Sequence, residues 1–144
     1  MFWKKTERVS NIDNKASERI DSFGIILLRE SRMRSTTEYE IVMKDEGAEI
    51  SLYSIVYSSG EDRRELCKRA VCSTESFLKL LNDCRLLSWD GFFGAHPKSV
   101  HDGMMFSLDA TVNREEKIHA NGSENFPKHY RDFTDGLYDI LNEE

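Results

Sequence analysis

Apolar and polar residues alternate along parts of the chain, and this alternation predicts strands. Tyr39, Ile41 and Met43 are separated by polar or charged residues, as expected of a half-exposed strand. Residues 48–57 are apolar on both faces, which is typical of a strand in the middle of a sheet. Because residues 45–47 (Asp-Glu-Gly) supply turn chemistry between the two stretches, we predict a hairpin.

Two other apolar stretches are less regular. Residues 23–30 contain the run Ile25-Ile26-Leu27-Leu28, which is too short for a helix and predicts a buried strand. Residues 63–72 fit either a short helix or a strand, and we favour a strand. That strand would have Leu66, Lys68 and Ala70 on one face and Cys67, Arg69 and Val71 on the other.

The strictest alternation lies at residues 104–112, where every second residue is apolar and a strand is predicted. Its hairpin partner, residues 117–121, must place Ile118 and Ala120 on the same apolar face, because a slip of one residue would move the whole set into water. We therefore predict that Val112 lies opposite Ile118, with a hairpin loop of three residues at 114–116. The same register places His119 opposite Thr111, on the solvent side.

Apolar residues recur at helical spacing in two stretches. Ser73 and Thr74 are suitable N-caps for a first helix at about residues 74–85. A second helix is predicted to begin at Pro127, because proline is well tolerated in the first turn. Its apolar stripe consists of Tyr130, Phe133, Leu137, Ile140 and Leu141.

Each half of the chain contains strands followed by a helix. This order predicts an α+β fold in which an antiparallel sheet has two helices packed on one face. Residues 23–144 are expected to form a single domain. Residues 1–22 are mostly polar and predict an N-terminal arm that is loose or marginally helical.

Net charge, apolar runs and cysteine spacing indicate which partners and which cellular compartment to expect. The net charge of −6 argues against nucleic acid and anionic membrane surfaces as partners. No apolar run approaches the roughly 20 residues of a membrane span, and the N-terminus lacks the apolar core of a signal peptide. The three cysteines show no C-x-x-C spacing and predict reduced thiols, so we expect a cytoplasmic protein, monomeric or homodimeric.

The segment before the second helix is a candidate site for a small anionic ligand. A helix start offers free N–H groups, and here cationic side chains take the place of the usual carboxylates. The candidate anion-binding residues are Gly122, Ser123, Asn125, Lys128 and His129.

A metal site is the alternative. His96, His101 and Asp102, together with His129, form a His/Asp set, although the His-x4-His spacing matches no ligand template. No cysteine or hydroxyl has a recognisable partner base, and Asp90 and Asp102 precede glycine as turn residues do, so no catalytic residue is assigned. No cofactor is predicted.

The C-terminal half carries a distinctive set of short motifs. They are Trp89-Asp90-Gly91-Phe92, His96-Pro97-Lys98, Asp102-Gly103, and Gly122-Ser123-Glu124-Asn125-Phe126-Pro127-Lys128-His129-Tyr130. This pattern resembles an uncharacterised bacterial domain family of unknown function. The resemblance implies an antiparallel sheet with helices and brings no catalytic residues.

The sequence therefore predicts a shape more clearly than a reaction. We expect a small cytosolic, non-catalytic domain that binds an unidentified protein or a small ligand. An enzyme or metal protein built on the histidine and aspartate set around His96, His101, Asp102 and His129 is the alternative.

Overall fold

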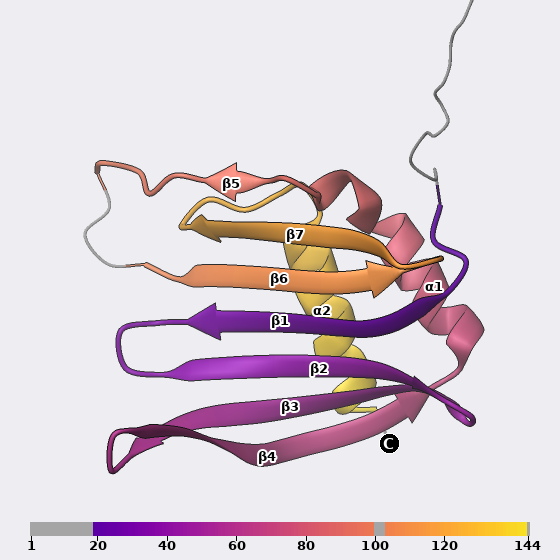
Figure 1. Ribbon diagram of the computed structural model, residues 1–144, viewed down its shortest axis with the longest axis horizontal. Helices are drawn as coiled ribbons and strands as arrows, with labels where there is room; N and C mark the ends of the chain where they lie inside the picture. The colour runs from indigo at the N-terminus through magenta and orange to yellow at the C-terminus, as the bar shows by residue number, and fades with distance from the viewer. Residues whose placement is uncertain (1–18, 100–102, 144) are drawn as a thin grey trace, which may run out of the picture.

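The structure is a computed structural model that describes residues 19–99 and 103–143. Its seven strands form one sheet in the order β4-β3-β2-β1-β6-β7-β5 (Figure 1). The strands are β1 (Phe23–Ser31), β2 (Thr36–Lys44), β3 (Gly47–Ser58), β4 (Glu61–Cys72), β5 (Phe93–Gly94), β6 (Met105–Val112) and β7 (Glu116–Ser123). The helices are α1 (Thr74–Asp83), the short 3-10 helix η1 (Leu86–Trp89) and α2 (Tyr130–Leu141). The predicted α+β class and antiparallel sheet are confirmed.

The sheet is larger than the sequence indicates because it gains β5 at one edge. β5 pairs in parallel with β7, with Phe93 opposite Asn121 and Gly94 opposite Gly122. All the other neighbouring strands pair antiparallel. A strand of two residues is too short to show an alternating pattern, so this one is invisible to periodicity.

β4 is a strand, as favoured above, but the predicted assignment of its faces is wrong at Leu66. Leu66 lies opposite Tyr53 and Lys68 lies opposite Leu52, so Cys67 is an extra residue in a β-bulge. Residues paired across two strands share a face, and successive residues of one strand do not. Leu66 and Lys68 therefore lie on opposite faces of the sheet, and Leu66 is half exposed.

β6 and β7 pair two residues away from the predicted register. Ile118 lies opposite Ala110 rather than Val112, and the three-residue loop, 113–115, begins one residue earlier than predicted. Asn113 has a φ of 51°, a left-handed conformation that asparagine adopts more readily than most residues and that favours a turn here. A shift of two residues keeps every side chain on its face, so Ile118 is buried as predicted.

α1 is capped as predicted, since the Ser73 hydroxyl accepts a hydrogen bond from the Ser76 N–H at 3.0 Å. The helix ends at Asp83, earlier than predicted, because Arg85 takes a left-handed φ of 55°. Among the described residues, no helix is long and apolar enough to cross a membrane.

Each helix reaches the sheet through aromatic rings. In α1, the ring of Phe77 lies 5.2 Å from that of Phe23 of β1. In α2, the ring of Tyr130 lies 4.8 Å from that of Phe106 of β6, and α2 crosses the sheet behind β1 and β2 (Figure 1). The apolar stripes predicted for both helices are thus the parts that enter the core, and their burial is the main stabilising contribution.

Ile20, from the predicted N-terminal arm, is part of the core and is fully buried. The Asn82 side chain holds its backbone from both sides: Oδ1 accepts from the Ile20 N–H at 2.7 Å, and Nδ2 donates to the Ile20 carbonyl at 3.0 Å. Asn113 Oδ1 similarly accepts from the Asp21 N–H at 2.7 Å. Residues 1–18 of the arm lie outside the described part of the chain.

Replacing Asn82 with alanine is expected to lower the free energy of unfolding by about 1–3 kcal/mol, because the buried N–H and C=O of Ile20 lose their partners. Urea denaturation monitored by circular dichroism measures this. The control is Asn121→Ala, whose amide makes only a 3.5 Å contact with His119 and which should change stability by less than about 0.5 kcal/mol. Equal stability of Asn82→Ala and the control would contradict the role given to Asn82.

Candidate functional site

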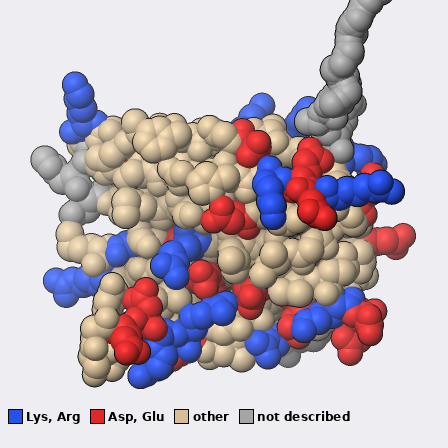
Figure 2. Space-filling model, in the orientation of Figure 1, with Lys and Arg blue, Asp and Glu red and all other residues tan. Residues whose placement is uncertain are grey.

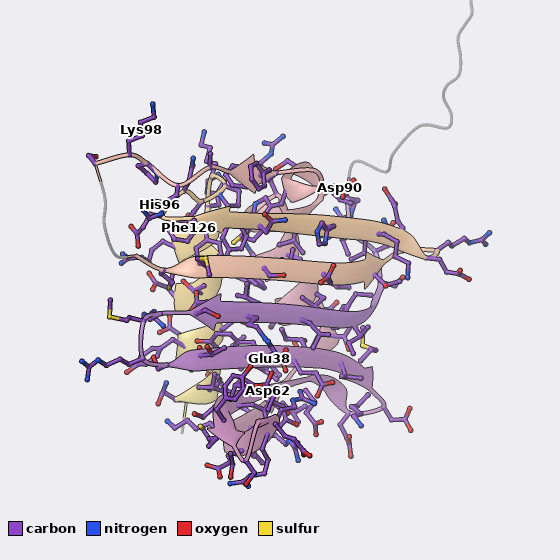
Figure 3. The ribbon with its side chains drawn as sticks, turned by 60° about the vertical axis from the view of Figure 1, so that its left-hand side comes forward. Glu38, Asp62, Asp90, His96, Lys98 and Phe126 are labelled. Carbon is purple, nitrogen blue, oxygen red and sulfur yellow. The ribbon has the colours of Figure 1, made fainter. Side chains whose placement is uncertain are left out.

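Two segments that the sequence marks as candidates meet at one corner of the sheet. We call residues 92–99 and 122–130 the β5–β7 corner. The Nδ1 atom of His96 lies 2.7 Å from the Ser123 hydroxyl, and the Asn125 amide donates to the Ala95 carbonyl at 3.3 Å. Figure 3 shows His96 at this end of the sheet and Asp90 well away from it.

Two glycines allow the two segments to approach closely. A Cβ atom on Gly94 would lie 2.5 Å from the Asn125 carbonyl oxygen, and one on Gly122 would lie 2.2 Å from the same atom. Both distances are too short for a side chain, and the obstacle is backbone that cannot move aside. The corner therefore depends on glycine at both positions.

The inner side of the corner is a cluster of aromatic rings. Trp89 is buried, and its indole N–H donates to the Lys128 carbonyl at 3.1 Å. The Trp89 ring lies 5.7 Å from both Tyr130 and Phe133. Phe126 lies 4.8 Å from Tyr130. Such ring pairs stabilise the protein beyond their buried area, so Trp89 has a structural role in the core.

The start of α2 differs from the prediction. The helix begins at Tyr130, and His129 has a left-handed φ of 72°, so Pro127, Lys128 and His129 form a turn before the helix. Pro127 does not open the helix, because the left-handed backbone of His129 interrupts the helical conformation between the two. The first turn of α2 contains Asp132, whose carboxylate lies 3.0 Å from His129 Nδ1. A carboxylate therefore occupies the place that the anion hypothesis gives to cations.

The five predicted anion-binding residues do not line one cavity. Gly122 and Ser123 line a hollow on the strand side of the corner, whereas His129 lines a separate hollow beside α2. Asn125 and Lys128 are exposed and line neither of these hollows. Binding of a small anion by all five residues remains a prediction that this arrangement does not favour.

The residues of the metal alternative are only partly described. His96 bonds to a hydroxyl at the corner, whereas His101 and Asp102 lie outside the described residues. His119 lies opposite Asp109, a consequence of the shifted register, and its Nδ1 is 2.6 Å from the Asp109 carboxylate. Within residues 19–99 and 103–143, no group of three or more His, Cys, Asp or Glu residues could hold a metal ion.

The hollow on the strand side has mostly apolar walls, and we call it the apolar groove. It has a volume of about 320 Å³ and is lined by Phe93, Met105, Phe106 and Gly122, with Arg29 and His96 among its polar groups. Phe93 is 73% exposed and Met105 is 54% exposed. Figure 2 shows uncharged surface over β5 and the nearby ends of β6 and β7.

The surface over β2, β3 and β4 has a different character. Figure 2 shows Lys and Arg interleaved there with Asp and Glu. Arg64 lies 3.1 Å from Glu38 and 3.3 Å from Glu40, and its guanidinium lies over the Tyr53 ring at 3.9 Å.

Sequence reasoning missed a buried carboxylate. Glu30, at the end of β1, is 7% exposed, and its Oε2 accepts a hydrogen bond from the Tyr130 hydroxyl at 2.5 Å. Burial and the Glu30 carboxylate raise the pKa of Tyr130 well above its ordinary value, so the hydroxyl keeps its proton. The available signal was the period of two in β1, which places Glu30 on the same face as Ile26 and Leu28.

The three thiols differ in their environment. Cys84 is buried, and this burial raises its pKa to about 11. Burial also raises the pKa of Cys72, which is half buried. Cys67 is exposed at the bulge in β4. A buried, protonated thiol is inert, so Cys84 is not suited to nucleophilic catalysis.

Alkylation of the folded protein with iodoacetamide at pH 8 is therefore expected to modify Cys67 and to leave Cys84 intact. At that pH only about a thousandth of the Cys84 groups would be thiolate, even where reagent could reach them. Mass spectrometry of peptides measures both, and labelling in urea provides the fully reactive reference. Labelling of Cys84 at the rate seen for Cys67 would contradict the burial of the Cys84 thiol.

No protein-family model matches this chain, and the search of curated proteins finds no relative. The resemblance of the C-terminal motifs to an uncharacterised bacterial domain family remains an expectation. The functional argument therefore depends on the geometry of the β5–β7 corner and on the two hollows beside it.

Proposed function

We propose that the protein is a small cytosolic, non-catalytic binding domain whose apolar groove receives an extended segment of another protein. In this proposal both helices cover one face of the sheet and the other face remains open for the partner. The exposure of Phe93 and Met105 around the apolar groove is the observation that carries the proposal. Three free cysteines among the described residues fit a reducing compartment.

A further exposed apolar side chain lies beside the groove. A second, smaller hollow of about 280 Å³ adjoins the groove and shares Met105, His96 and Ser123 with it. Its wall includes Met33, which is 72% exposed. Exposed apolar side chains that gather around a hollow are typical of interaction sites, and methionine adapts to differently shaped partners.

The edge of the sheet supports an extended partner. β5 is the last strand on its side of the sheet, so the described residues place no strand against its outer edge. An extended segment laid beside β5 would add a strand and place an apolar side chain over Phe93. Because β5 has only two residues, side-chain contacts would supply most of the affinity. Arg29 and His96 line the same groove and would orient the partner through its polar groups.

The enzyme or metal alternative has no comparable support among the described residues. His96 and His129, two members of its set, line different hollows. Phe106 lines the apolar groove, and Phe126 lines the hollow beside α2. The two rings lie 5.5 Å apart. A shared site for these two histidines would need this ring pair to move.

Replacing Phe93 with alanine is expected to lower the recovery of the partner about tenfold, since an exposed aromatic anchor contributes at least about 1.4 kcal/mol at an interface. Affinity capture from the native host, quantified by mass spectrometry, compares wild type, Phe93→Ala and Tyr57→Ala. Tyr57 is the matched control because it is 78% exposed on β3 and does not line the groove. Wild-type melting temperatures establish that both variants fold.

The proposal predicts proteins that Tyr57→Ala retains and Phe93→Ala loses. Recovery of the same proteins in equal amounts by all three forms would overturn it. So would the absence of any protein above background with the wild type.

A further inference from the structure

The hollow beside α2, which His129 also lines, contains the buried carboxylate of Glu30. The carboxylate is held in the core because β1 places it in line with Ile26 and Leu28. Removing a carboxylate from water is costly unless hydrogen bonds replace those that it loses. The Tyr130 hydroxyl supplies one such bond, to Oε2.

The other carboxylate oxygen is not satisfied in the same way. Glu30 Oε1 lies 3.8 Å from Arg32 Nη2, which is an ion pair but too long for a hydrogen bond. Among the described residues, no group donates a hydrogen bond to Oε1. Tyr39 lines the same hollow, and its pKa is raised by burial and then by the Glu30 charge. Within the described part of the chain its hydroxyl likewise has no hydrogen-bond partner.

Aromatic and charged side chains both line this hollow, which we call the Glu30 hollow. It has a volume of about 650 Å³, enough for a small organic molecule. The aromatic residues lining it are Tyr39, Phe126, Tyr130 and Tyr138. Aromatic faces attract a cation, and a buried carboxylate among them adds a hydrogen-bond acceptor and a negative charge.

The Glu30 hollow is lined by further charges of both signs, since Asp132 and Asp135 line it together with two arginines. Arg32 and Arg131 both line it, and Arg32 is half exposed. A ligand with only a positive charge would leave these guanidinium groups without a partner on the ligand. A ligand that also carries a carboxylate can pair with one of them, since a guanidinium binds carboxylates in a bidentate manner.

We propose that the Glu30 hollow binds a small zwitterion of the α-amino acid class. Its ammonium group donates to Glu30 Oε1, its carboxylate pairs with Arg32 at the rim, and its side chain lies against the aromatic wall. This site is distinct from the apolar groove, since Glu30 and Tyr130 line only the former. It therefore stands or fails independently of the proposed protein partner.

The test is a titration of the full-length ¹⁵N-labelled protein with each standard L-amino acid at millimolar concentrations. The readout is the set of backbone amide signals of Glu30, Arg32, Tyr39 and Asp132. We expect saturable shifts with at least one amino acid. The N-acetyl derivative of that amino acid should bind about tenfold more weakly or worse, because it has no ammonium group to donate to a charged acceptor.

Two variants test the contacts of the ligand's ammonium group and of its carboxylate separately. Glu30→Gln should lower the affinity about tenfold, whereas the control Glu49→Gln, on the opposite face of the sheet, should leave it unchanged. Because Glu30→Gln also alters a core hydrogen bond, Arg32→Gln provides an independent test at an exposed position. Arg32→Gln should weaken binding of the amino acid and leave binding of its amide, which has no carboxylate, unchanged or tighter.

Three results would overturn the proposal. The first is the absence of saturable shifts at the Glu30 hollow with every amino acid. The second is equal binding of the free and N-acetylated forms. The third is a set of shifts that persists undiminished in both Glu30→Gln and Arg32→Gln, which would identify non-specific adsorption to the aromatic side chains.

Discussion

The hydrogen bond between the Tyr130 hydroxyl and the Glu30 carboxylate joins the start of α2 to the end of β1, across 100 positions of sequence. The Tyr130 ring also contacts Trp89 of η1 and Phe106 of β6. Since each partner belongs to a different element, the position of Tyr130 determines how these elements meet. Without this bond the carboxylate would be buried without its hydrogen-bond donor, which costs several kcal/mol.

The same cluster of rings divides the surface into two sites of different chemistry. On the strand side, exposed Phe93 and Met105 border an apolar groove suited to a protein segment. Beside α2, Glu30 and Arg32 offer opposite charges close together at an aromatic wall, which suits a small zwitterion. Phe106 lines the apolar groove and Phe126 lines the Glu30 hollow, so the two proposed sites share this ring pair as a scaffold. Arg32 lines the Glu30 hollow and also the smaller hollow beside the groove.

The long strands and helices and their buried faces could be predicted from the sequence. The alternation at residues 104–112 and the apolar stripe of α2 gave the right elements and faces because burial follows a period of two or 3.6. The bulge at Cys67 and the two-residue register shift depend on local turn geometry, which has no periodic signal. The Glu30–Tyr130 pair could not be predicted because the two residues are distant in sequence. The left-handed conformation of His129, which precedes the start of α2 at Tyr130, likewise has no periodic signal.

A double-mutant cycle on Glu30 and Tyr130 tests the importance of this hydrogen bond most directly. Urea denaturation of Glu30→Met, which removes the acceptor, of Tyr130→Phe and of the double variant gives the coupling free energy between the two side chains. Because a buried hydrogen bond to a charged group contributes about 1.5–3 kcal/mol, we predict a coupling of at least about 1.5 kcal/mol. Effects that add to within about 0.3 kcal/mol would contradict the central position given to this pair.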